Sequence, residues 1–252
     1  MELNEAAETL IENHKPAEAI VLLDSLQRTY PKEKEAQRYG MWLRPRAIEQ
    51  LTITEIAGVD SLLAVNKILY EQTLPLMKKI DNPELVESYW VVAESYNPEF
   101  LNSDGVQARV GREGEFYMIS SAVGGNLKHN SFSLKPSTGG SAVESGVVPY
   151  DDELNYRLDG TEVVTYMSES CDTIGQTAEN LPEGTTSIVT LLGEGGKNRQ
   201  IKLTALETSA IGTAHRFARS ITDSRNLTVK RDKLERMLEL ARDQQARTFP
   251  EK

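Results

Sequence analysis

The stretch LTITEIAGVDSLLAVNKILYE, residues 51–71, carries the pattern on which the predicted fold depends. Large apolar residues recur there and just beyond at intervals of seven, at Ile56, Leu63, Tyr70 and Met77. An apolar stripe with this interval is typical of a helix that packs against another helix along its length. Pro75 must break or kink the helix, because proline lacks a backbone N–H. We therefore predict a long helix in the segment 51–86.

A second helical pattern lies near the other end of the chain, in residues 207–252. A first helix carries Ile211 and Ala218 on one face, and a second, over residues 227–245, carries Leu234 and Leu238. At 1.5 Å per residue this second helix and the helix of residues 51–71 are each roughly 30 Å long. We expect the two to pair antiparallel as a coiled-coil-like stalk. A packed ridge along the face of a sheet is the competing arrangement.

The middle of the chain, residues 87–206, has the composition of a β-rich domain. Short runs rich in β-branched and aromatic residues occur at 89–92, 116–119, 162–166, 187–191 and 200–203. Clusters of Gly, Asn and Asp separate them, which is the spacing of hairpins in a sandwich or barrel. The predicted class is therefore α+β, with a mainly antiparallel β-sandwich or barrel-like domain inserted between the two long helices.

Residues 1–50 are predicted to be helical, beginning with a helical hairpin over residues 1–31. Pro16 suits the first turn of its second helix, where a missing N–H is tolerated. The hairpin resembles a tetratricopeptide repeat at Leu3, Ala6, Ala7, Leu10, Ala19, Leu23, Leu26 and Pro31. It departs from that motif at Leu3, where Trp is usual, and at His14, where Gly is usual. The resemblance implies close helix packing and no particular ligand, and the sequence shows no second copy.

Composition and charge exclude several classes of protein. Of 252 residues, 39% are hydrophobic and 26% charged, so the chain is neither disordered nor a membrane protein. A net charge of −10 argues against nucleic acid as a general partner. Residues 216–252 hold ten Lys and Arg against six Asp and Glu, which a solvated helix face explains most simply. The single cysteine, Cys171, excludes an internal disulfide and a cysteine-rich zinc site; we expect an inert, half-buried thiol in a strand.

The sequence suggests few sites for chemistry, and we assign no catalytic residue, cofactor or metal. The segment 193–197, GEGGK, lacks the spacing of a phosphate loop and is predicted to be a hairpin turn. Asp151, Asp152 and Glu153 are weak candidates for a Ca²⁺ site, because consecutive acids in a loop more often face water. Trp90 and Tyr166 are weak candidates for binding a ligand, since aromatic residues on a sheet can stack on sugar rings.

The three histidines, His14, His129 and His215, lie far apart with no metal-binding spacing, and a structural role is expected for each. Ser141 lacks the trailing glycine of a nucleophile elbow. A Ser/His/Asp set is assembled in space, so a hydrolase with a dispersed triad stays open as a third hypothesis. It requires a histidine within hydrogen-bond reach of a Ser, Cys or carboxylate in a pocket.

The order of hairpin, long helix, β-rich centre and C-terminal coiled-coil helix is similar to that of uncharacterised cell-envelope lipoproteins of Gram-negative gut bacteria. The residues that carry this resemblance lie in the segments 16–26, 30–33, 60–63 and 233–237. The N-terminus itself, MELNEAAETL, has no signal-peptide pattern. The resemblance implies export to the cell envelope or periplasm and membrane anchoring through a lipidated N-terminus that this sequence does not contain.

The leading functional prediction is a non-enzymatic scaffold of the cell envelope that binds another protein. It depends on the lack of a catalytic motif and on a hairpin type that commonly serves in protein interactions. The alternative prediction is binding of a glycan or small ligand by the β-rich domain.

Overall fold

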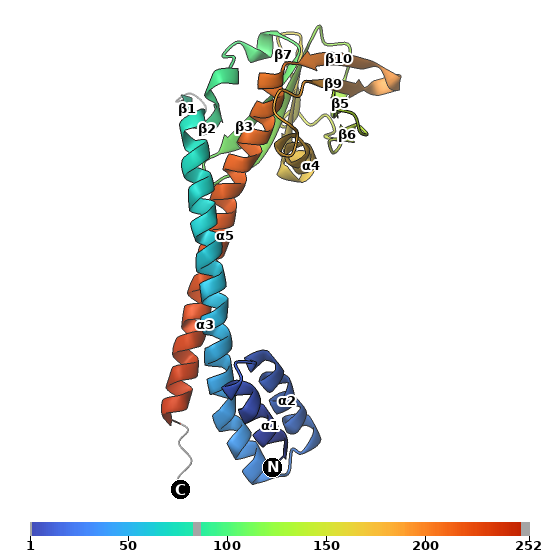
Figure 1. The fold of residues 1–252 in the computed structure, drawn as a ribbon. Helices are drawn as coiled ribbons and strands as arrows, with labels where there is room; N and C mark the ends of the chain where they lie inside the picture. Colours follow the sequence, from blue (N-terminus) through green and yellow to red (C-terminus); the bar gives the residue numbers. More distant parts are fainter. Residues whose placement is uncertain (1, 83–86, 248–252) are drawn as a thin grey trace. The chain divides into compact units, whose positions relative to one another are not determined.

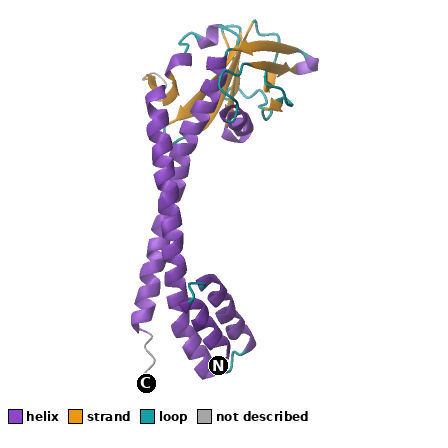
Figure 2. Ribbon diagram, viewed as in Figure 1, coloured by secondary structure: helices purple, strands orange, loops and turns teal. Residues whose placement is uncertain are grey.

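A computed structural model describes residues 2–82 and 87–247 and confirms the α+β class, with long N- and C-terminal helices flanking antiparallel sheets. The chain divides into two compact units. We call residues 1–65 and 224–252 the helical unit, and residues 66–223 the β unit. In Figure 2 helices are purple and strands orange.

The helical unit begins with the predicted hairpin. Helices α1 (Glu2–Glu12) and α2 (Pro16–Thr29) pack on the first part of α3 (Lys34–Thr73) around a core of Ala7, Ile11, Ala19, Leu23, Leu43 and Ala47. Ala7 and Ala19 have no exposed surface, so the small residues do allow close helix packing. His14 adopts a φ of 56° in the turn between α1 and α2. This left-handed conformation is one that glycine adopts most readily.

The second half of α5 (Ala205–Arg247) pairs with α3 inside the helical unit. Arg231 Nε lies 2.7 Å from Asp60 Oδ1, and Arg242 Nε lies 2.8 Å from Glu49 Oε1. Residues later in α5 therefore meet residues earlier in α3, so the predicted antiparallel pairing of the two helices is confirmed in this unit.

Both long helices are more continuous than predicted. The helical segment expected after the hairpin, up to residue 50, and the helix expected from residue 51 are one helix, α3, which continues through Pro45. Those expected around residues 211–221 and 227–245 are likewise one helix, α5. The segment between these last two expected helices, residues 222–226, contains neither glycine nor proline, so nothing in its backbone forces a break.

The β unit contains two antiparallel sheets (Figure 1). The larger has the order β1 (Met77–Asn82), β2 (Glu87–Val92), β3 (Gly105–Gly111), β4 (Phe116–Val123), β8 (Thr161–Met167) and β7 (Asn155–Leu158). The smaller has the order β10 (Asn198–Leu203), β9 (Ser187–Gly193), β5 (His129–Pro136) and β6 (Val143–Glu144). The remaining elements are α4 (Ser168–Glu179) and the short 3₁₀ turns η1 (Leu74–Leu76), η2 (Ala93–Ser95), η3 (Phe100–Asn102) and η4 (Glu194–Gly196).

All five predicted strand runs fall in strands, namely β2, β4, β8, β9 and β10. The helix expected over residues 51–86 is wrong at its end, because α3 stops at Thr73 and residues 77–82 form β1; residues 83–86 lie outside the described residues. Pro75 stands in η1, and the strand after it pairs with β2. The strand expected around Cys171 is also wrong. Buried Cys171, Ile174 and Ala178 follow helical spacing in α4.

One apolar core joins the two sheets of the β unit. It includes Met118 and Tyr166 from the larger sheet and Phe132 and Leu191 from the smaller one. The first half of α5 packs on the same core through Phe217 and its neighbours. The competing arrangement, a helix lying along the face of a sheet, therefore describes this half of α5.

Candidate functional site

Three polar side chains from three strands form a buried chain of hydrogen bonds in the β unit. The Ser120 Oγ lies 2.7 Å from His129 Nε2, and His129 Nδ1 lies 3.0 Å from the Glu162 Oε2. Their exposed fractions are 0%, 1% and 2%. We call these three residues the buried triad. It meets the hydrogen-bond requirement of the hydrolase hypothesis. No contiguous sequence motif could reveal this triad.

Strand pairing and one irregularity bring the triad together. Strands β4 and β8 are neighbours in the larger sheet, so Ser120 and Glu162 come from adjacent strands. His129 comes from β5 of the smaller sheet, at a register shift between His129 and Ser131. Lys128, just before this strand, has a φ of 52°. The local bend lets the backbone N–H groups of Lys128 and His129 both donate to the Glu162 carboxylate, at 2.7 and 3.0 Å.

Burial and hydrogen bonding set the charges of the triad in opposite ways. Burial lowers the pKa of His129, and its hydrogen bond to Glu162 offsets this only in part. Burial would raise the pKa of Glu162, but the hydrogen bonds from Lys128 and His129 outweigh it and hold that pKa below its ordinary value. The triad is therefore a neutral histidine beside an ionised carboxylate near pH 7.

The arrangement has the order of a nucleophile, a base and an orienting carboxylate, but Ser120 does not meet solvent. Its Oγ also lies 3.4 Å from the Tyr166 hydroxyl oxygen, within the apolar core. A catalytic serine must reach the substrate carbonyl. In this structure the triad instead links the two sheets through the Ser120–His129 hydrogen bond.

A polar cavity of about 340 Å³ adjoins the triad on the side of His129 and Glu162. Its lining also includes Lys128, Tyr150 and Asn155, as well as Asn130, Arg157 and Glu194. We call it the polar cavity. Its size lies within the range of small-molecule sites.

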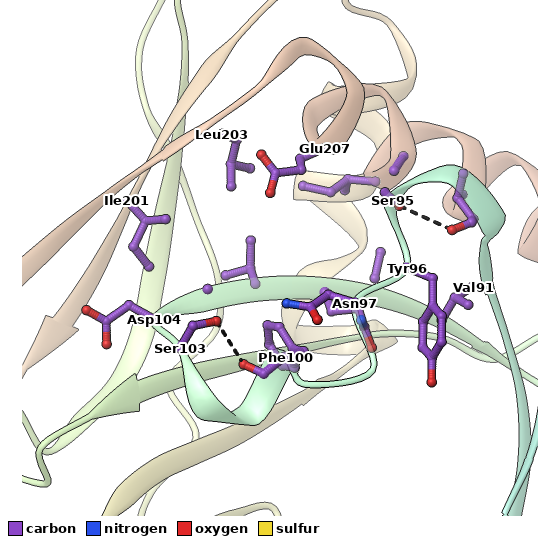
Figure 3. Close-up of a pocket in the computed structure, with 17 residues that line it drawn as sticks. Val91, Ser95, Tyr96, Asn97, Phe100, Ser103, Asp104, Ile201, Leu203 and Glu207 are labelled. Atoms are coloured by element: carbon purple, nitrogen blue, oxygen red, sulfur yellow. Dashed lines mark hydrogen bonds between the residues drawn. The ribbon is translucent and has the colours of Figure 1, made fainter.

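A second cavity in the β unit, shown in Figure 3, holds only about 100 Å³. It lies beside β3 and the start of α5, and its lining is mixed, with Phe100 and Leu203 among polar residues. The Glu207 carboxylate in its wall already accepts hydrogen bonds from the Thr204 backbone and hydroxyl at 2.8 Å. Glu207 therefore forms a capping box that starts α5. This cavity is too small for a drug-sized ligand.

The helical unit has a wider groove of about 630 Å³ where α1 begins, α2 ends and α3 begins. Leu3, Leu26, Tyr30 and Ala36 provide its apolar lining, and Glu2, Glu33 and Glu35 provide its charge. We call it the acidic groove. Tyr30 is 48% exposed there.

Each of the two aromatic residues proposed from the sequence packs against another aromatic ring of the β unit. Tyr166 has no exposed surface and packs edge-on against Phe132, with ring centres 4.8 Å apart. Trp90 packs against Phe217, with ring centres 5.6 Å apart. Both serve the core of the β unit.

The three consecutive acids form a loop that uses one carboxylate for its own backbone. Asp151 Oδ1 accepts hydrogen bonds from the backbone N–H groups of Glu153, Leu154 and Asn155 at 2.8–2.9 Å. Asp152 accepts a hydrogen bond from the Tyr150 hydroxyl. Among residues 2–82 and 87–247 there is no group of three or more His, Cys, Asp or Glu side chains that could hold a metal ion.

The other residues singled out from the sequence have structural positions. His215, 1% exposed, lies between Glu179 and Asp172, with nitrogen–oxygen distances of 2.7 and 3.1 Å. Cys171 is also fully buried, and burial raises the pKa of its thiol to about 12. Ser141 and His14 are exposed. The segment 193–197 is the turn of the β9–β10 hairpin, as predicted.

No family model and no curated protein matches the chain. No helix in the described part of the chain combines the length and apolar character that crossing a membrane requires.

The buried triad was missed from the sequence because its members are 9 and 33 residues apart. One feature of the sequence could have pointed to it: a polar residue on the apolar face of a strand, as Ser120 stands between Met118 and Ala122 at alternate positions of β4.

Proposed function

We propose that this chain is a non-enzymatic scaffold whose helical unit holds a basic, partly apolar segment of another protein in the acidic groove. The groove itself carries the proposal. Its apolar residues offer contact area, and its three glutamates complement lysine or arginine.

The glutamates without the apolar residues would be weak support for a partner-binding groove. Glu2 and Glu35 stand in the first turns of α1 and α3, where negative charge stabilises a helix N-terminus. That role does not account for Tyr30, which leaves about half of its surface in solvent beside them. A half-exposed tyrosine in the same groove lining as a buried leucine, Leu26, is a suitable anchor point for a partner side chain.

The test is site-specific photo-crosslinking in cells that carry the native gene. A photoreactive phenylalanine replaces Tyr30 in one variant and Val21, which is 63% exposed on α2, in the control. We expect crosslinks from position 30 to one protein, at a peptide containing Lys or Arg, and none to that protein from position 21. Glu33→Lys with Glu35→Lys should abolish the crosslink. Equal crosslinking from both positions, or crosslinking unaffected by the charge reversals, contradicts the proposal.

The address in the cell envelope is a separate part of the proposal and depends on the resemblance of element order. Fractionation of cells that express the full-length gene, together with metabolic labelling by a fatty-acid analogue, tests it. We expect the label on the protein in the membrane fraction; an unlabelled protein in the cytosol contradicts it.

A further inference from the structure

We propose that the polar cavity of the β unit binds a neutral, hydroxyl-rich small molecule, of which a sugar ring is the simplest example. This inference is independent of the scaffold function, because the cavity lies wholly within the β unit and the acidic groove wholly within the helical unit.

The cavity has a floor of buried polar side chains. His129, Asn155 and Glu162 line it, although each is at least 94% buried. Buried polar groups are normally fully hydrogen-bonded. The Asn155 Nδ2 donates to the carbonyls of Val148 and His129, at 2.8 and 3.3 Å. Within the described residues its Oδ1 accepts no hydrogen bond, so the cavity floor offers an acceptor that the protein does not use.

The Glu162 carboxylate offers a second acceptor. Three protein N–H groups donate to it, from the Lys128 backbone, the His129 backbone and the His129 ring. A carboxylate has about four acceptor positions. A fixed carboxylate with one remaining position next to a free amide oxygen suits a ligand with neighbouring hydroxyl groups.

The wall supplies donors and an aromatic face. The Arg157 guanidinium lies 5.7 Å from the centre of the Tyr150 ring. Arg157 makes no ion pair within the described part of the chain, so its N–H groups can donate to a ligand. Tyr150 is 57% exposed, which leaves ring surface for contact with a sugar's C–H groups.

The charge of the lining favours a neutral ligand. Lys128 is paired with Glu194 at 3.0 Å, and the charge of Arg157 is balanced by that of Glu162. An acidic ligand would be attracted by Arg157 but repelled by the carboxylates of Glu162 and Glu194. An apolar ligand would leave the floor acceptors without donors, which is unfavourable.

Ligand-observed NMR with the full chain tests the proposal. The probes are three neutral sugars (N-acetylglucosamine, galactose and maltose) and two charged compounds of similar size (glucuronate and glutamate), each at millimolar concentration. Arg157→Ala and Tyr150→Ala remove the wall without touching the floor. Arg112→Ala, at an exposed turn between β3 and β4, is the matched control. Trp90 fluorescence verifies that the β unit of each variant is folded.

We expect at least one neutral sugar to bind, with both wall variants weakening it about tenfold or more and the control leaving it unchanged. Three results overturn the proposal: no neutral sugar binds, a charged compound binds more tightly than every neutral sugar, or the wall variants bind like the control. A crosslink at Tyr30 with no sugar binding would leave the scaffold function standing and remove this inference alone.

Discussion

The β unit buries its most important polar contacts, whereas the helical unit leaves its charged pairs and many apolar side chains in solvent. In the β unit, the hydrogen-bonded His129 and Glu162 side chains have almost no exposed surface. In the helical unit, the Arg242–Glu49 pair has side chains 58% and 25% exposed. Val65 and Met41 are 62% and 65% exposed. The difference fits the two proposals, a small ligand inside a cavity of the β unit and a partner protein on the surface of the helical unit.

The two tryptophans allow the comparison to be measured. Trp42 lies in α3 within the helical unit, where it packs with Tyr39, and Trp90 lies in β2 of the β unit. Trp42→Phe and Trp90→Phe therefore each leave one fluorescent reporter for one unit. The predictions below use these two backgrounds with urea unfolding.

Glu162→Ala should have the largest effect. It removes the acceptor of the Lys128 and His129 backbone N–H groups and of the His129 ring. Each buried donor left without an acceptor typically lowers the free energy of unfolding by about 1–3 kcal/mol, so losing the acceptor of three donors should cost about 3 kcal/mol or more. We expect that loss from the Trp90 signal and no change from the Trp42 signal. A loss below about 1 kcal/mol would mean that water reaches the triad and that the contrast between the units is wrong.

Gly212→Ala should come next, with a loss of about 1–3 kcal/mol in the β unit from overpacking. A Cβ at position 212 of α5 would lie 2.7 Å from backbone atoms of Ala178 and Glu179 in α4. These backbone atoms cannot move aside as a flexible side chain would. An unchanged melting temperature by Trp90 fluorescence would show that the two helices separate easily.

Acidification should destabilise the β unit through His129. Its folded pKa lies below the ordinary value of about 6.5, so its contribution is present above that pH. It is lost as the pH falls toward the folded pKa, because the unfolded chain binds the proton first. The free energy of unfolding should fall with a slope of up to about 1.4 kcal/mol per pH unit below pH 6.5.

His129→Gln should remove this slope from the Trp90 signal, whatever its effect on stability at pH 7. Glu162, whose folded pKa is also lowered, adds a further loss below its ordinary value near 4.5. An equally steep slope in His129→Gln between pH 6.5 and 5 would assign the effect to another group.

Gly58→Ala should stabilise the helical unit by about 1 kcal/mol, because alanine is the better helix former. Gly58 is exposed in the interior of α3, and a Cβ there would have nothing within 4 Å. The measurement is the Trp42 unfolding midpoint. Destabilisation would show that this face of α3 is covered in solution, for example by another molecule.

Arg242→Ala should have the smallest effect, a loss of about 0.5 kcal/mol in the helical unit that shrinks further in high salt. Its partner, Glu49, has a pKa held below the ordinary value by hydrogen bonds from Arg242 and Gln245. A loss as large as that of Glu162→Ala would abolish the contrast between buried and exposed pairs.

Local pattern sufficed for the elements whose own residues bury one face. The hairpin of α1 and α2, the helical character of α3 and α5, and the five strands with β-branched runs were all predicted from spacing. Strand β5 was missed because its sequence, HNSFSLKP, is largely polar, and β3, GVQARVG, was missed because its apolar residues alternate with Gln and Arg and form no continuous run. They are strands because their neighbours in the sheets pair with them.

By itself the sequence determined the class of fold, the order of its elements and the antiparallel pairing of its long helices, since apolar periodicity is a property of neighbouring residues. Only the tertiary structure decided where the polar residues meet. Ser120, His129 and Glu162 come from three strands in two sheets, and the polar cavity and acidic groove likewise take residues from several elements. Hydrogen bonds and cavities depend on distances in space, which strand order and register set and local spacing does not.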